Sequence, residues 1–219
     1  MFIKIELSSE FKKLKRFSAG DKEFNFKPGI NLIVGRNGTG KSTLMSILTN
    51  YIDVLGSRSK ALKRAIDPIE KEKLKKEFNE KFEKGINIEI SDTPCKTFSF
   101  DTENTTRTSS RVETMIDVTS RWMSHGEFII TAMKKLKDVK ENSIVLIDEP
   151  ETALDFENIL LLEDIFSTLD NVSMQLICVT HNPILIGSKK YSKNFIKLNN
   201  FNVEDYLQNY KNYINFLTN

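Results

Sequence analysis

One glycine-rich stretch, residues 35–42, constrains the fold more than any other part of the sequence. It fits G-x-x-x-x-G-K-[ST], a turn whose backbone N–H groups point at phosphate oxygens, with Lys41 neutralising charge and Ser42 ligating Mg²⁺. A β-branched, strand-like run enters it and an amphipathic helix leaves it, so an anion is expected at the helix N-terminus. The residues expected to bind the nucleotide here are Gly35, Arg36, Asn37, Gly38, Thr39, Gly40, Lys41, Ser42 and Thr43.

The bulk properties narrow the class of protein. With 219 residues, 39% of them hydrophobic, the chain can bury a sizeable core and is expected to form a single domain, 1–219. A net charge of +2 argues neither for nor against nucleic acid. Cys95 and Cys178 lack disulfide-framework or metal-ligand spacing, which favours reduced thiols in a cytoplasmic protein. No stretch approaches membrane-spanning length, so direct membrane insertion is not expected.

The segments around the glycine-rich turn predict a mixed architecture. Residues 2–7 and 22–27 alternate at period two, which predicts antiparallel strands before the phosphate-binding strand. The basic segment 11–17 between them is compatible with a nucleic-acid contact, although a solvated face or edge-strand protection is favoured. Residues 51–85 are rich in Lys and Glu and predict a helical lobe. Two strand-like runs, 86–90 and 95–100, follow.

Two buried strands further along end in chemically active side chains. The run 143–147 is apolar on both faces, which is typical of a central parallel strand, and it leads into Asp148 and Glu149. Asp148 is placed to hold Mg²⁺, and Glu149 to activate the water that attacks a γ-phosphate. The run 174–179 ends similarly, before Thr180 and His181. His181 is therefore interpreted as a γ-phosphate sensor rather than an isolated core or surface histidine.

A small-residue turn at 123–127 precedes another helical run, 128–133. Ser124 can act as the N-cap and Glu127 as its partner at the third helical position, a role that needs no ligand. From the residues alone, this capping role and a functional role remain equally open.

These motifs, GRNGTGKS, MSHGE, IVLIDEPE, TALD and VTHNP in this order, resemble the ATP-binding-cassette ATPases, specifically the soluble branch related to RecF, RecN and the SMC proteins. The resemblance covers residues 30–48 and 121–187. It implies that Ser124 and Gly126 form the signature motif, within a region at about 112–138, that Asp155 belongs to the D-loop and that His181 is the switch histidine. It also implies a head-to-tail homodimer that holds two ATP molecules, in which Ser124 of one chain completes the γ-phosphate site of the other.

The sequence departs from this family in lacking the glutamine between the phosphate loop and the signature. Asp101 or Glu103 is hypothesised to replace it as a residue near Mg²⁺. The residue that stacks on adenine is also open, since Phe24 and Phe26 are candidates but core packing explains both equally well.

The C-terminal region predicts a helix with one apolar face, for which packing on the sheet is favoured over a partner-binding groove. Its apolar positions are Val203, Tyr206, Leu207, Tyr210, Tyr213, Ile214 and Leu217.

The expected fold is α/β, a P-loop NTPase with a central mostly parallel sheet, an N-terminal antiparallel β portion and an inserted helical lobe. The expected function is ATP hydrolysis with Mg²⁺ in an ATP-dependent dimer that drives or switches a separate partner protein. The expected pathway is DNA repair, recombination or phage defence, in which DNA would be a further partner. The alternatives are the nucleotide-binding subunit of a transporter and a nucleotide-gated binding module with very slow hydrolysis.

Overall fold

The computed structural model describes residues 1–17, 21–57, 84–91, 96–101, 124–136, 143–169 and 174–218. Most of the predicted helical lobe, residues 102–123 with Glu103, and Cys95 lie outside the described residues. The strands are β1 (Ile3–Leu7), β2 (Glu23–Phe26), β3 (Gly29–Val34), β4 (Ile86–Ile90), β5 (Lys96–Asp101), β6 (Ser143–Asp148), β7 (Met174–Val179) and β8 (Lys193–Lys197). The helices are α1 (Lys41–Ser57), α4 (His125–Leu136), α5 (Phe156–Leu169), α6 (Pro183–Gly187) and α7 (Val203–Thr218), with 3₁₀ turns η1 (Leu14–Arg16) and η4 (Pro150–Thr152).

The central sheet is parallel, as predicted, with the strand order β5-β6-β7-β3-β8. Strands β3, β6 and β7 have almost no exposed residue because helices cover both faces. A second sheet, β2-β1-β4, is antiparallel. The predicted antiparallel portion is thus confirmed, and the run 86–90 joins it although it follows the first helix.

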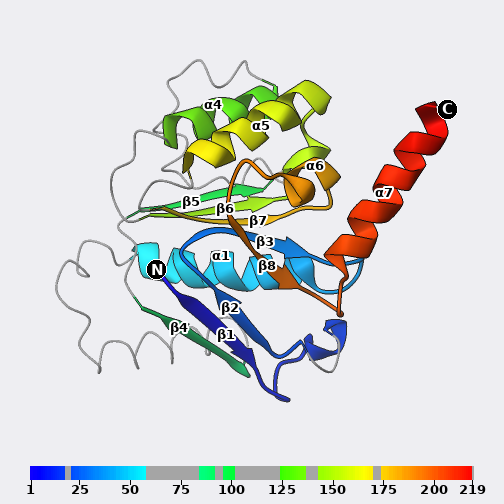
Figure 1. Cartoon of the computed structure of the whole chain (residues 1–219). Coiled ribbons are helices and arrows are strands. Elements are labelled where there is room, and N and C mark those ends of the chain that lie inside the picture. Colours follow the sequence, from blue (N-terminus) through cyan, green and yellow to red (C-terminus); the bar gives the residue numbers. More distant parts are fainter. Residues whose placement is uncertain are drawn as a thin grey trace.

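Helix α1 lies between the two sheets, and α4 and α5 cover the other face of the parallel sheet (Figure 1). The core is accordingly divided in two. One cluster joins α1 to both sheets, and the other joins the parallel sheet to α4, α5 and α6. Alternate residues of β6 serve the two clusters, since Ile144 faces α1 and Val145 faces α5.

The aromatic side chains of β2 belong to the core. Phe24 is 4% exposed and Phe26 is fully buried, and both pack in the cluster around α1. Neither ring is available to stack on adenine, so period-two core packing explains them.

The C-terminal helix forms as predicted, but the expectation that it packs along the sheet is wrong. Val203 is buried, and Tyr206 and Leu207 pack against the core at its base. Beyond them α7 projects away from the domain (Figure 1). The apolar stripe therefore continues past the last available packing surface, and its exposed members are Tyr210, Tyr213, Ile214 and Leu217, together with Phe216.

Candidate nucleotide site

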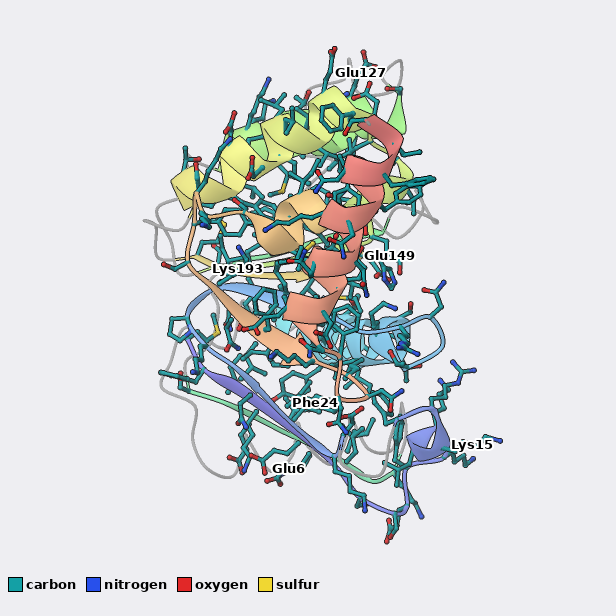
Figure 2. All side chains as sticks on the ribbon, turned by 45° about the vertical axis from the view of Figure 1, so that its right-hand side comes forward. Glu6, Lys15, Phe24, Glu127, Glu149 and Lys193 are labelled. Carbon is teal, nitrogen blue, oxygen red and sulfur yellow. The ribbon has the colours of Figure 1, made fainter. Side chains whose placement is uncertain are left out.

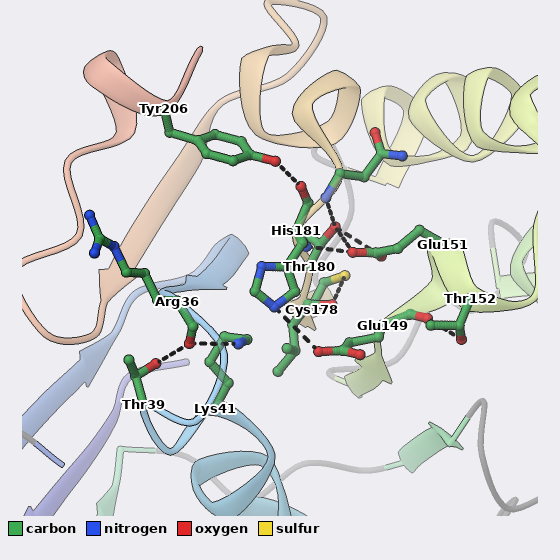
Figure 3. A network of polar contacts seen from close by, with 12 residues as sticks. Arg36, Thr39, Lys41, Glu149, Glu151, Thr152, Cys178, Thr180, His181 and Tyr206 are labelled. Carbon is green, nitrogen blue, oxygen red and sulfur yellow. Dashed lines mark hydrogen bonds and ion pairs between the residues drawn. The ribbon is translucent and has the colours of Figure 1, made fainter. Parts of the chain in front are cut away.

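The glycine-rich turn connects β3 to α1 through two glycines with positive φ. Gly38 and Gly40 have φ values of 77° and 99°, which side chains with a Cβ rarely adopt. Thr39 Oγ1 donates to the carbonyl of Arg36 at 2.8 Å, and Lys41 Nζ donates to the same carbonyl at 3.2 Å (Figure 3). Burial lowers the pKa of Lys41, while Glu149, Asp148 and Glu151 act in the opposite direction. The ammonium group of Lys41 thus lies within the electrostatic influence of the acidic residues at the end of β6 and in the turn that follows it.

The basic segment before β2 packs against this turn, a contact that the sequence did not indicate. Arg16 Nη1 donates to Thr43 Oγ1 at 3.3 Å. The ring of Phe17 lies against Gly40, where an added Cβ would come within 2.8 Å of it. No local pattern links residues 16 and 43, so only the tertiary fold reveals that Arg16 borders the nucleotide site.

The carboxyl ends of three parallel strands bring the predicted residues to one edge of the sheet. Val179 is in register with Ile33 on one side and with Asp148 on the other. Asp148 is in turn in register with Asp101 of β5. The backbone therefore places Asp101 beside Asp148, and the hypothesis that an acidic residue takes the place of the missing glutamine stays a prediction.

Glu149 has a left-handed backbone, with φ 45° and ψ 60°. Such a conformation is sparsely populated for a side chain with a Cβ and is found preferentially at functional sites. Here the chain is held by two contacts: the N–H of Glu149 donates to the carbonyl of Val179, and the Glu149 carbonyl accepts from Thr152. The turn directs the Glu149 carboxylate toward the end of β7.

His181 meets Glu149 at that point, with Nε2 of the imidazole 3.5 Å from Oε1 of the carboxylate. Burial lowers the pKa of His181, and the charge of Lys41 lowers it further, while Glu149 raises it. Burial and Lys41 therefore favour the neutral imidazole. Lys41, Glu149 and His181, which come from three separate motifs, surround one site (Figure 3).

Glu151 is the site residue that sequence reasoning missed. Both carboxylate oxygens accept from Thr180 Oγ1 at 2.9 Å, and one of them accepts from the N–H of His181. Burial raises the pKa of Glu151, whereas these hydrogen bonds lower it. Glu151 lies within the acidic motif, but its partners Thr180 and His181 are about thirty residues away. No local sequence pattern indicates these contacts.

The signature turn forms the capping box that the residues allowed. The N–H and hydroxyl of Ser124 donate to the Glu127 carboxylate at 2.8 and 2.9 Å, and the N–H of Glu127 donates to Ser124 Oγ at 3.3 Å. These bonds lower the pKa of Glu127. The cap does not exclude a ligand, because Ser124 is exposed and opens the 12-residue helix α4.

The signature turn and the D-loop are in direct contact. A Cβ added to Gly126 would lie 2.4 Å from the carbonyl oxygen of Ala153. Asp155 caps helix α5 by accepting from the N–H of Asn158 at 2.8 Å. Glu127 lies at the outer end of the α4–α5 layer, well apart from Glu149 (Figure 2). Ser124, bonded to Glu127, therefore does not join the residues gathered around Lys41.

The donor set fits a Mg²⁺ nucleotide. Mg²⁺ commonly takes one or two carboxylates and completes its shell with phosphate oxygens and water. Ser42 is exposed in the first turn of α1, and Asp148 ends β6, which β7 separates from β3. Within the described ranges, no three His, Cys, Asp or Glu side chains gather into a metal site. Ser42 and Asp148 would hold the ion together with phosphates, which is the arrangement the loop allows.

The parallel sheet, the glycine-rich turn before α1 and the acidic strand end together define a P-loop NTPase. The family model described as RecF/RecN/SMC N terminal domain matches residues 6–200. The chain belongs to this family and is an ATPase of the ATP-binding-cassette type.

The chain is also similar to curated ATP-binding proteins. The chain is 30% identical over 188 residues to "Cytochrome c biogenesis ATP-binding export protein CcmA" of Vibrio vulnificus, covering 78% of this chain and 88% of the relative. The protein of the same name from Vibrio parahaemolyticus is 26% identical over 186 residues, with the same coverage. A solved structure described as "An inward-facing conformation of a putative metal-chelate type ABC transporter" is also similar, with a TM-score of 0.49 and 17% identity over 90% of this chain and 79% of that chain.

Proposed function

We propose that this chain binds ATP with Mg²⁺ at residues 35–43 and hydrolyses it, using Glu149 and His181. The observation that carries the proposal is the approach of Glu149 to His181 beside Lys41, at the edge where the phosphate loop begins. Glu149 would accept a proton from the attacking water, and neutral His181 would contact the γ-phosphate. Lys41 and the loop N–H groups would hold the phosphates, and the bound ion would neutralise their charge.

Ser124, Gly126 and Asp155 are proposed to complete the site of a second copy. Ser124 and Asp155 are exposed, whereas Gly126 is buried. Glu127, to which Ser124 is hydrogen-bonded, stands apart from Glu149 of its own chain (Figure 2). Two chains related by a two-fold axis would bring each signature turn to the other's phosphate loop. The proposed organisation is one domain, 1–219, with a helical lobe at about 51–85 and a signature region at about 112–138.

The partner is proposed to be a separate protein, the membrane subunit of an exporter, rather than DNA. The curated relatives support the transporter alternative better than the repair, recombination or defence pathway expected from the sequence. None of the helices in the described ranges is both long and apolar enough to span a bilayer. An ATPase subunit that acts on a partner would be consistent with both observations.

Size measurements with a hydrolysis-deficient variant test the dimer and the site together. Glu149→Gln should lower kcat about 10²–10⁴-fold and, with Mg²⁺-ATP, should shift from 25.2 kDa to about twice that mass in light scattering. Glu89→Gln, an exposed glutamate on β4, is the matched control and should behave like the parent. A Glu149→Gln variant that stays monomeric at saturating ATP would contradict the composite site.

The partner class needs its own assay. Turnover of the parent is measured with membrane fractions from the source cells and, separately, with duplex DNA at increasing salt. An export-type partner predicts co-purification with a membrane protein and no effect of DNA. Stimulation by DNA that disappears steeply as salt rises would overturn the export proposal and restore the nucleic-acid pathway.

A further inference from the structure

The peptide groups on both sides of His181 are held by side chains from two other elements. On one side, the N–H of His181 donates to the Glu151 carboxylate in η4. On the other side, the carbonyl of His181 accepts from the hydroxyl of Tyr206 in α7. Figure 3 shows both contacts, with the imidazole between them directed at Glu149. The peptide groups that precede and follow the Cα of His181 are therefore each held by a hydrogen bond.

The Glu151 contact extends into a buried polar network. Thr180, which is fully buried, donates its hydroxyl to Glu151 and accepts at the same oxygen from the N–H of Asn182 at 2.9 Å. Asn182 then caps α6 by accepting from Ile184 and Leu185. One carboxylate thus sets the path of the chain from the end of β7 to the start of α6.

The Tyr206 contact ties the projecting helix to the same point. Tyr206 lies at the base of α7, half-buried, with its ring centroid 5.4 Å from that of Phe201. Most of α7 beyond it is exposed. Tyr206 is therefore the polar contact by which α7 reaches the site, since its hydroxyl bonds the histidine carbonyl directly.

We propose that Glu151 and Tyr206 are positioning residues for His181, which fix its backbone so that the imidazole faces Glu149. The inference rests on the proposed function, because it assigns His181 a place in hydrolysis. With both flanking peptides fixed, only the two side-chain torsions of His181 remain free. Loss of either contact releases the backbone and widens the range of imidazole positions around Glu149, while the phosphate loop is untouched.

The test uses the full chain and two conservative variants. Tyr206→Phe removes only the hydroxyl, and Tyr213→Phe makes the same change at an exposed position of the same helix. Glu151→Gln keeps an acceptor oxygen, whereas Glu151→Ala removes both. Steady-state kcat, ATP affinity by calorimetry and the imidazole NMR spectrum are measured for each. The chain has two histidines, so His181→Ala identifies the His181 resonance by its loss.

Tyr206→Phe should lower kcat by about three- to tenfold, the equivalent of one ordinary hydrogen bond, with ATP affinity within about twofold of the parent. Its His181 resonance should shift, whereas Tyr213→Phe should match the parent in every measurement. Glu151→Ala should lose more turnover than Tyr206→Phe, and Glu151→Gln should recover part of that loss. A purely structural role would instead lower ATP affinity and thermal stability together.

Each failure has a distinct signature. If the parent hydrolyses ATP and Glu149→Gln does not, but Tyr206→Phe keeps the parent's kcat or the parent's His181 resonance, the positioning role is wrong and the proposed function stands. If the parent itself does not hydrolyse ATP, the proposed function is wrong. The His181 resonance alone then decides whether Tyr206 positions the imidazole, and an unshifted resonance rejects it.

Discussion

The imidazole Nε2 of His181 lies 3.5 Å from Oε1 of Glu149, and each side chain is about one third exposed, 32% and 30% respectively. The two residues end neighbouring parallel strands, and their contact joins the acidic motif to the histidine motif. Both side chains are partly open to solvent, although the Nε2 atom of His181 that faces Glu149 is itself buried. The pair also makes the protonation state of His181 responsive to its neighbours.

The titration of His181 should follow those neighbours with a defined sign. In the parent, its NMR midpoint should lie below the ordinary value of 6.5 because burial and Lys41 disfavour the charged ring. Lys41→Met should raise the midpoint and Glu149→Gln should lower it. Between the folded pKa and 6.5 the unfolded chain binds more protons, so this group makes stability fall as pH falls through that window. If the NMR midpoint of His181 in the parent lies above 6.5, burial and Lys41 do not disfavour its charged form, and this prediction is wrong.

Two inactive variants should restore activity to each other when mixed. Lys41→Ala disables the phosphate loop, and Ser124→Asp keeps a good N-cap while its charge opposes a phosphate. In a head-to-tail dimer, a mixed pair has one site with both parts intact. An equimolar mixture should therefore recover about one quarter of parental turnover, since about half of the dimers are mixed and each has one working site. Turnover no greater than the sum of the separate variants would reject the composite site.

Gly126 should tolerate no side chain, because the Ala153 carbonyl lies 2.4 Å from where a Cβ would sit. Gly126→Ala should cost about 1–3 kcal/mol of unfolding free energy, measured by denaturant titration, as α4 and the D-loop move apart. Gly187→Ala is the matched control in α6, where the nearest atom is a flexible Leu207 methyl at 3.2 Å. If Gly126→Ala and Gly187→Ala lower the unfolding free energy equally, the close approach of the Ala153 carbonyl to Gly126 is not the cause of the loss.

The outer part of α7 should contribute little to folding stability. Phe216 is 79% exposed, so Phe216→Ala should change the unfolding free energy by less than about 0.5 kcal/mol. Phe166 of α5 is fully buried, and Phe166→Ala should cost about 3–5 kcal/mol. A large loss from Phe216→Ala in the monomer would mean that the helix packs against the domain in solution.

The parts of the fold that could be predicted are those encoded by neighbouring residues. Alternation at 2–7 and mostly apolar runs at 30–34 and 143–147 identify half-buried and fully buried strands, because burial on one or two faces leaves a direct pattern. The ends of those buried strands then place Asp148 and His181 at one edge. The capping box at Ser124 is likewise a property of four consecutive residues.

The parts that could not be predicted depend on contacts between distant residues. Glu151 and Thr180, or Tyr206 and His181, become neighbours only when the sheet order is known. The packing of α7 likewise depends on distant parts of the chain. An apolar stripe shows that a helix face is suited to burial, but it does not show that the domain offers a surface long enough to cover it.

The position of β7 in the sheet has a consequence for how the protein is made. Strand β3 is synthesised before both of its neighbours, β7 and β8, which begin at Met174 and Lys193. Among the described strands, β7 alone joins the β5–β6 pair to the β3–β8 pair. A nascent chain that stops short of Met174 carries the whole phosphate loop on an unpaired strand. Pairing of the strand that carries the phosphate loop is thus expected only after Met174 has been synthesised.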